Sequence, residues 1–371
     1  MSNQVKIEKT ISPFNKRIVV SSDKSLSIRC ILLSSIAIGK SRIFNLLQSE
    51  DVINALRTVK KLGVNIVMKK KFLDIYGVGI NGFNIKKNTV IDAGNSGTLA
   101  RCILGLCSGT KKKIKLIGDK SLSKRDFSRV IKPLNLFGVN IKSRNGILPI
   151  ELTGSDLLRP IKYLENKGSA QIKTCIILSA INTKGVTKIK TKRSRNHTEL
   201  LLKYLNYPIK IKKNKNYDLI EIEGLKQFKS FKYNVPGDIS SASFFIILTL
   251  LSKKSKMLIK NININTSRIG IVKILNKMNA NIKIINKRNY KGEHIGDIKI
   301  KSTKYFKSIN CPEILNSSAI DEFLLIFLVA AKSKGISSFK SLEELNKKES
   351  PRLEIAIKFL KMIGIKVLRK N

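Results

Sequence analysis

Apolar and polar positions along this chain repeat one pattern five times. Each copy opens with small polar residues, continues as a long apolar helix pattern and a short strand pattern, and closes with a second amphipathic helix that ends in a strand. The starts of the copies are about 70 to 80 residues apart, which is too long for common solenoid repeats and long enough for a small α/β unit. The copies span residues 25–66, 96–141, 169–209, 240–282 and 318–367. The pattern therefore predicts an α/β protein built from repeated units.

The long helices begin with Ser or Asn before an apolar run, as in KSLSIRCILLSSIA and NSGTLARCILGLCSG. Such residues cap helix N-termini, where backbone N–H groups and the helix dipole favour an anion. Cations lie near three of these starts, namely Lys24 and Arg29, Arg101, and Lys173. One capped helix with a solvated cation is commonplace, but the recurrence predicts a cleft that binds anions at several points.

The charge of the chain ordinarily indicates nucleic-acid binding, because 72 Lys and Arg residues against 25 acidic ones give a net charge of +47. However, the lysines are spread along the whole chain together with abundant Ile and Asn. Trp is absent and aromatic residues make up 6%, so no platform for stacking bases is indicated. We interpret the charge as a compositional bias and expect non-specific adhesion to RNA or DNA only as a side property.

Length and hydrophobicity predict a soluble protein of two domains. The chain has 371 residues, 42% of them hydrophobic, which is enough for a large core. Its longest apolar runs, such as 323–331, are shorter than the roughly 18 residues that span a membrane. The N-terminus lacks the apolar core of a signal peptide. We therefore expect a cytoplasmic protein.

Metal, cofactor and nucleotide chemistry have few of their usual signals here. The five cysteines show no metal-binding spacing, and four lie in apolar helix patterns, so core thiols are expected. Two histidines give little material for a zinc site or a histidine-based triad. There is no GxxxxGK[ST] loop and no GxGxxG after a strand. We expect no metal and no cofactor.

Eight short motifs lie at the repeat boundaries. In chain order they are KSLSIR, GNSGT, KR, SAQ, SRNHTE, VPGDISSA, IDE and KESPR. One of them alone is a weak signal, whereas eight in order are specific. Through these motifs, from Ser22 to Val367, the chain resembles the family of 3-phosphoshikimate 1-carboxyvinyltransferase, or EPSP synthase. That family joins phosphoenolpyruvate to shikimate 3-phosphate in the shikimate pathway.

The resemblance implies an inverse α/β prism of two lobes. Each lobe of the family has three βαβαββ units, with helix N-termini facing the cleft between the lobes. One lobe is expected at residues 21–234, and the other at residues 1–20 plus 235–371, with hinges near Ser21 and Tyr233. Five units are expected here instead of six. The sixth unit of the family supplies an Asp-His-Arg helix start and a later Lys that hold phosphoenolpyruvate.

The resemblance also implies roles for individual residues. The reaction adds the 5-hydroxyl of shikimate 3-phosphate to C2 of phosphoenolpyruvate, protonates C3 and expels phosphate, so it needs a base, an acid and positive charge. The implied catalytic residues are Asp321 for the hydroxyl proton, Glu349 for the methylene carbon, and Lys24 in contact with both substrates. The implied ligands of shikimate 3-phosphate are Lys24, Ser25, Arg29, Ser169, Gln171, Ser194, Arg195, Asp321 and Lys348. Those of phosphoenolpyruvate are Lys24, Gly97, Arg125, Gln171 and Arg352.

The chain departs from the family pattern at three places. Residues 21–23, Ser-Ser-Asp, stand where Pro-Gly-Ser is usual, Asp126 follows the arginine where Pro is common, and Pro351 replaces a common Asp. Of these, Asp23 matters most, because it places a carboxylate next to the anion-binding Lys24.

Two further interpretations stay open beside a monomeric transferase that binds only these two substrates. Each acid also has a possible non-catalytic role. Asp321 can be a charge at a helix N-terminus, and Glu349 can pair with Arg352 on an exposed helix. The chain can then be a non-catalytic relic or a basic nucleic-acid-adhering protein on the same scaffold. The sister enzyme that acts on UDP-N-acetylglucosamine is disfavoured, because residues 118–125 lack its typical cysteine.

Overall fold

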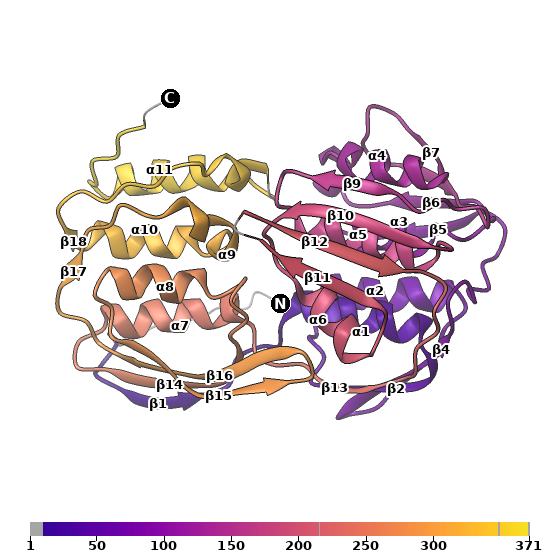
Figure 1. Ribbon diagram of the computed structural model, residues 1–371. Coiled ribbons are helices and arrows are strands. Elements are labelled where there is room, and N and C mark those ends of the chain that lie inside the picture. The colour runs from indigo at the N-terminus through magenta and orange to yellow at the C-terminus, as the bar shows by residue number, and fades with distance from the viewer. Residues whose placement is uncertain (1–9, 215, 348, 370–371) are drawn as a thin grey trace, which may run out of the picture.

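The computed structural model describes residues 10–214, 216–347 and 349–369. Two bodies lie side by side, and in the second body the helices α7, α8, α10 and α11 stack above one sheet (Figure 1). Each body has its own hydrophobic core. One core is built from residues between Leu26 and Val235, and the other from Val20 together with residues between Ile239 and Leu360.

The first body contains three similar units, each a four-stranded sheet with two helices. The first has α1 (Lys24–Ile36), α2 (Glu50–Lys61), β2 (Ile38–Phe44), β3 (Asn65–Met68), β4 (Phe72–Val78) and β13 (Lys232–Asn234). The second has β5 (Thr89–Asp92), α3 (Gly97–Leu106), β6 (Ile114–Ile117), η1 (Leu122–Lys124), α4 (Ser128–Phe137), β7 (Asn140–Ser143) and β8 (Ile150–Thr153). The third has β9 (Lys162–Glu165), α5 (Ala170–Ile181), β10 (Val186–Lys192), α6 (His197–Tyr204), β11 (Ile209–Lys213) and β12 (Tyr217–Glu223).

The second body contains one complete unit and one with a smaller sheet. The complete unit has β1 (Asn15–Ile18), α7 (Ile239–Leu251), β14 (Lys256–Asn263), α8 (Gly270–Lys277), β15 (Ile282–Tyr290) and β16 (Glu293–Lys301). The other has β17 (Phe306–Lys307), η2 (Glu313–Leu315), α9 (Asn316–Ala319), α10 (Phe323–Ala331), β18 (Ser333–Lys334), η3 (Glu343–Lys347) and α11 (Arg352–Met362).

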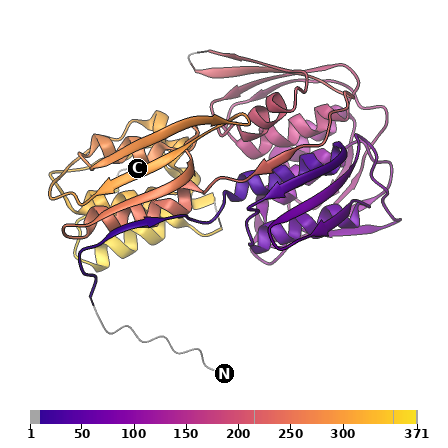
Figure 2. The same ribbon diagram turned by 90° about the horizontal axis from the view of Figure 1, so that it is seen from below.

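The four larger sheets share one topology. In the sheet β5-β6-β8-β7, the strand before the first helix pairs in parallel with the strand after it, and the other pairs are antiparallel. Two edge strands come from distant parts of the chain. Strand β1 pairs with β14, so the N-terminal strand lies with the second body (Figure 2), and β13 pairs with β2 in the first. These exchanges give two crossovers between the bodies.

The crossovers run next to each other and are hydrogen-bonded. The backbone amide of Asp23 donates to the carbonyl of Pro236 at 2.8 Å, and that of Asp238 donates to the carbonyl of Ser21 at 2.9 Å. Ser22 also forms an antiparallel bridge with Gly237. Both crossover segments pass between the bodies at this point. The hydrogen bonds between them therefore fix the relative position of the starts of α1 and α7.

The sequence predicted that a strand ending at Val367 closes the fifth copy, and this prediction is wrong. Residues 365–369 form no strand after α11. In each of the other four copies, the strand after the second helix pairs with the strand that follows it, as β3 pairs with β4 and β15 with β16. Within the described part of the chain, residues 365–369 pair with no strand, and a segment without a pairing partner does not form a sheet.

The expectation about Lys173 as a cation of the cleft is also wrong. Its side chain is fully buried and forms a 2.7 Å ion pair with Glu199, whose side chain is 3% exposed. Lys173 lies in the fourth position of α5, on the side that faces α6 rather than the helix start. The pair therefore joins two helices inside the first body.

The cysteines belong to the interior. All five thiols are free and buried, and burial raises the pKa of the Cys107 thiol to about 12. They behave as apolar core groups in this fold. Within the described ranges, every helix is too short or too polar to cross a bilayer.

Candidate functional site

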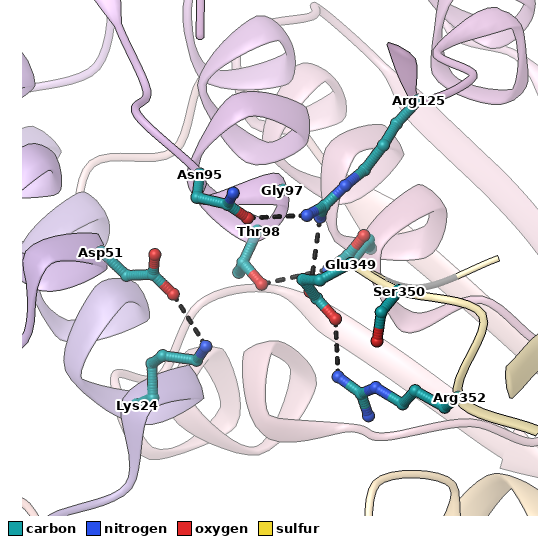
Figure 3. A pocket seen from close by; sticks show the side chains of 10 residues that line it. Lys24, Asp51, Asn95, Gly97, Thr98, Arg125, Glu349, Ser350 and Arg352 are labelled. Carbon is teal, nitrogen blue, oxygen red and sulfur yellow. Dashed lines mark hydrogen bonds and ion pairs between the residues drawn. The ribbon is translucent and has the colours of Figure 1, made fainter. Parts of the chain in front are cut away.

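A polar cavity of about 390 Å³ joins elements from both bodies (Figure 3). Ten residues line it. Six of them were predicted for the site from the sequence, and the other four are Asp51, Asn95, Thr98 and Ser350. The six are Lys24, Gly97, Arg125, Gln171, Glu349 and Arg352. The helices α1, α3 and α5 begin here in the first body, and the segment before α11 comes from the second. Residues more than 300 positions apart therefore meet in one cavity, as the predicted anion cleft requires.

The helix starts at the cavity are capped partly by carboxylates of the chain itself. Ser96 caps α3 and Ser169 caps α5, as predicted. However, the amides of residues 167–169 donate to the buried carboxylate of Glu165, and the cap of α1 is Asp23. Buried N–H groups need partners, and carboxylates near a helix start are favourable. The donors at the start of α1 and those just before α5 are therefore already bound in part by carboxylates of the chain.

Two arginines hold the Glu349 carboxylate between them. Arg125 lies 3.3 Å from Oε1 through Nη1 and donates through Nη2 to Asn95 Oδ1 at 2.7 Å, while Arg352 lies 2.6 Å from Oε2 (Figure 3). Burial alone raises the pKa of Glu349, but its backbone amide, Arg352 and Arg125 together lower it below the usual value. Glu349 is thus a carboxylate placed between two cations, where it competes with any incoming anion.

Asp321 is surrounded by arginines from both bodies. Its Oδ2 lies 2.5 Å from Arg195 Nη2 and 3.7 Å from Arg268 Nη1, and its Oδ1 lies 3.0 Å from Arg352 Nη1. Arg352 therefore contacts both acids that the sequence singled out. This arrangement connects Asp321 to the cavity, although Asp321 does not line it.

The carboxylate that contacts Lys24 is Asp51, not the neighbouring Asp23. Lys24 Nζ lies 2.7 Å from Asp51 Oδ2, and the lysine side chain is 48% exposed. Asp23 is fully buried, accepts a hydrogen bond from the amide of Leu26 at 2.9 Å and lies 3.9 Å from Arg268. The concern that Asp23 would weaken anion binding by Lys24 is therefore not supported, because Asp23 points into a different cluster.

Gln171 and Gly97 line the cavity and determine how closely the neighbouring arginines approach it. The amide oxygen of Gln171 accepts from Arg101 at 3.0 Å, and its nitrogen donates to Thr98 Oγ1 at 3.1 Å. A Cβ at position 97 would lie 2.8 Å from Nη1 of Arg101 and 3.0 Å from Nη1 of Arg125. Glycine at this position lets both guanidinium groups approach the start of α3.

The remaining predicted residues lie outside the cavity lining. Arg29 is buried and bonded to two threonines, Ser194 is buried, and Ser25 and Ser169 are half-buried. Within the described ranges the hydroxyl of Ser194 has no hydrogen-bond partner. Lys348 lies outside the described residues.

Sequence reasoning missed several side chains of the cavity. Asn95 and Thr98 belong to the GNSGT motif, and their polar side chains at a helix start were an available signal. Asp51 was not predictable, because it reads as an ordinary acidic residue in the first turn of α2 and only the fold brings it to Lys24.

The Asp23 carboxylate should stabilise the protein in a pH-dependent way. Although burial acts to raise its pKa, Arg268 and then His197 lower it below the usual 3.8. The stabilisation is therefore present above the unfolded-state pKa and is lost as the pH falls through the folded value. We expect Asp23→Asn, which keeps the capping oxygen, to cost about 1–2 kcal/mol at pH 7.

Urea unfolding of the wild type and of the Asp23→Asn variant, at pH 7 and in steps below pH 4, measures this effect. The difference between the two proteins should shrink as the pH falls. A difference that stays constant down to pH 2 would show that the charge of Asp23 is not the source.

Comparisons with known proteins agree with the geometry. The family model for EPSP synthase (3-phosphoshikimate 1-carboxyvinyltransferase) matches residues 8–371. A 3-phosphoshikimate 1-carboxyvinyltransferase of Ruthia magnifica is 41% identical over 348 residues, which cover 94% of this chain and 79% of the relative. One of Legionella pneumophila strain Corby is 37% identical over 361 residues, covering 97% and 82%.

Solved structures give the same result. The EPSP synthase of Acinetobacter baumannii superposes with a TM-score of 0.84 at 33% identity, covering 96% of this chain and 80% of that one. A second structure of the Acinetobacter enzyme gives 0.83, also at 33% identity, over 95% and 79%. The predicted two-lobed α/β fold of repeated units is thereby confirmed. The chain belongs to the EPSP synthase family.

Proposed function

We propose that this protein transfers the enolpyruvyl group of phosphoenolpyruvate to the 5-hydroxyl of shikimate 3-phosphate and releases phosphate. The observation that carries the proposal is the convergence of Lys24, Arg125 and Arg352 around one cavity that also holds Glu349. Both substrates are anions with phosphate and carboxylate groups. Such groups are bound well by arginine, which presents paired N–H donors to two oxygens at once.

The two substrates would bind in two adjacent parts of the site, each lined by its own set of side chains. Lys24, Gly97, Arg125, Gln171 and Arg352 would hold phosphoenolpyruvate, since all of them line the cavity. Lys24, Ser25, Arg29, Ser169, Gln171, Ser194, Arg195, Asp321 and Lys348 would bind shikimate 3-phosphate, and most of them surround the starts of α1, α5 and α6. Anionic substrates would replace Glu349 and Asp321 as partners of the arginines.

The two acids can carry the proton transfers. As the 5-hydroxyl oxygen bonds to C2 of phosphoenolpyruvate, its proton passes to Asp321, and C3 receives a proton from Glu349. In the second step the C2–O bond to phosphate breaks, C3 returns a proton to Glu349, and the double bond forms again. Glu349 must be protonated for the first step. Because Arg352 and Arg125 lower its pKa, their movement toward the substrate would help it to take up that proton.

We further propose that the bodies are the two lobes of the enzyme and that they close on the substrates. The lobes would be residues 21–234, and 1–20 with 235–371, and the paired crossovers near Ser21 and Tyr233 would be the hinge. The ion pair between Arg125 and Glu349 spans the two bodies at the cavity and supports this proposal. The buried free thiols are compatible with a cytoplasmic enzyme, and we expect a monomer.

Phosphate release by the purified protein tests the proposed function. We expect release that requires shikimate 3-phosphate and phosphoenolpyruvate together and that neither substrate supports alone. A folded protein that binds shikimate 3-phosphate but releases no phosphate would be a binding module and would contradict catalysis. Steep salt-dependent RNA binding without turnover would favour the nucleic-acid alternative.

A further inference from the structure

Arg29 is held in place by two buried threonines from different helices. Its Nε donates to Thr198 Oγ1 at 2.7 Å, and its Nη2 donates to Thr174 Oγ1 at 3.1 Å. The two threonine oxygens lie 2.8 Å apart and share a hydrogen bond. Thr174 belongs to α5 and Thr198 to α6, and they are 2% and 1% exposed. A third bond, from Nη1 to the carbonyl of Ser25 at 2.9 Å, ties the group to its own helix α1.

The partners of Arg29 are all uncharged. In the part of the chain that the structure describes, no carboxylate lies within ion-pair distance of Arg29, although only 4% of the residue is exposed. By contrast, Arg195, Arg268 and Arg352 each form ion pairs. A buried cation without a counter-ion is costly, and neutral hydrogen-bond partners only orient it. An arginine of this kind is prepared to receive an anion.

Counting donors shows what remains for a ligand. A guanidinium group has five N–H donors, and the three bonds above use one on each nitrogen of Arg29. One N–H therefore remains on each terminal nitrogen. Two such donors can bind the two oxygens of a carboxylate or phosphate.

We propose that Thr174 and Thr198 are positioning residues that fix the guanidinium of Arg29, so that its two remaining donors face an anionic group of shikimate 3-phosphate. This inference rests on the proposed function, which places Arg29 at that substrate. The threonines bind the arginine and each other and do not contact the substrate. Their effect is on binding of shikimate 3-phosphate, and the proton transfers do not depend on them.

Replacement of Thr198 by Val tests the role of the hydroxyl, because the two side chains have nearly the same shape. The variant loses the acceptor for Nε, so the guanidinium is left with a buried unpaired N–H and is free to tilt. Loss of a hydrogen bond to a charged group is expected to raise the Kd and KM for shikimate 3-phosphate about tenfold. The KM for phosphoenolpyruvate and kcat should change by less than about twofold.

Two further variants separate positioning from a structural role. Thr198→Ser keeps the hydroxyl, and its Kd should stay within about threefold of the wild-type value. Thr187→Val removes the hydroxyl of another buried threonine of the first body, whose oxygen has no hydrogen-bond partner within the described residues. It should leave the Kd unchanged. Thr174→Val should act in the same direction as Thr198→Val.

The Kd is measured by titration calorimetry without phosphoenolpyruvate, so the readout does not depend on turnover. Shikimate, which lacks the phosphate, is titrated in parallel. If Arg29 binds the carboxylate, Thr198→Val weakens both ligands by the same factor, and if it binds the phosphate, only shikimate 3-phosphate is weakened.

The outcomes separate this inference from the proposed function. Wild-type protein that binds and turns over shikimate 3-phosphate, with an unchanged Kd in Thr198→Val, would overturn the positioning role alone. An equal loss in Thr198→Ser and Thr198→Val would also overturn it, because the hydroxyl would then not matter. Wild-type protein that neither binds nor turns over the substrate would overturn both.

Discussion

Asp321→Asn is expected to lower kcat by about 10²- to 10⁴-fold, the usual contribution of a general base. The substitution keeps the shape of the side chain but removes its ability to take the hydroxyl proton. Arg195 and Arg352 contact its two oxygens at 2.5 and 3.0 Å. Anionic substrates that replace Asp321 as the partner of these arginines would free an oxygen to accept the proton. The measurement is phosphate release at saturating concentrations of both substrates, with thermal unfolding to show that the variant is folded.

Glu313→Gln is the matched control for Asp321→Asn. Glu313 is an exposed acid of the same body, and its carboxylate accepts a hydrogen bond from Ser341 away from the cavity. Its loss should leave kcat within about twofold. If Asp321→Asn kept more than a tenth of the wild-type kcat, Asp321 would not be the base, and the alternative of a mere helix-terminal charge would be favoured.

Lys173→Met is expected to lower the free energy of unfolding by about 3–5 kcal/mol, the usual cost of breaking a buried ion pair by removing one partner. The change leaves the Glu199 carboxylate without its counter-ion in the interior of the first body. Part of the loss should return in the double variant Lys173→Met with Glu199→Gln, because no buried charge is then left unpaired. Urea unfolding at pH 7 measures all three proteins.

The exposed ion pair between Lys188 and Glu221 provides the comparison for Lys173→Met. Its atoms are 2.9 Å apart, close to the 2.7 Å of the buried pair, but its side chains are 54% and 43% exposed. Water screens such pairs, so Lys188→Met should cost less than about 1 kcal/mol. Equal costs for the two lysine variants would mean that burial does not strengthen the Lys173 pair.

Much of the cavity lining could be predicted from short segments of the chain. The motifs KSLSIR, GNSGT and SAQ each combine a helix start with a polar side chain, and the helices α1, α3 and α5 begin at these motifs. Local patterns suffice here because capping and helix formation depend on residues three or four positions apart. The KESPR motif likewise precedes α11 and brings Glu349 and Arg352 to the cavity.

The same patterns failed where the answer depended on a distant partner. Lys173 resembles the cations near other helix starts, yet it turns inward because Glu199 of α6 lies on that side. Asp23 seemed to be a neighbour of the Lys24 charge, but the crossover places it against Arg268. Asp51 gave no signal of a role in the cavity, and the strand expected before Val367 lacks a partner within the described residues.

The sequence by itself determined the repeated α/β units, their apolar helices and the polar residues at the helix starts, because hydrophobic periodicity and capping are encoded within a few residues. The tertiary structure alone decided which charges far apart in the chain pair. It buried Lys173 with Glu199, placed Arg29 among neutral partners and brought Arg352 to Asp321, whereas the pair of Arg352 with Glu349 is local and was suggested by the sequence. The energy of a charge depends on its burial and on its nearest partners, and both are fixed only when segments far apart in the chain come together.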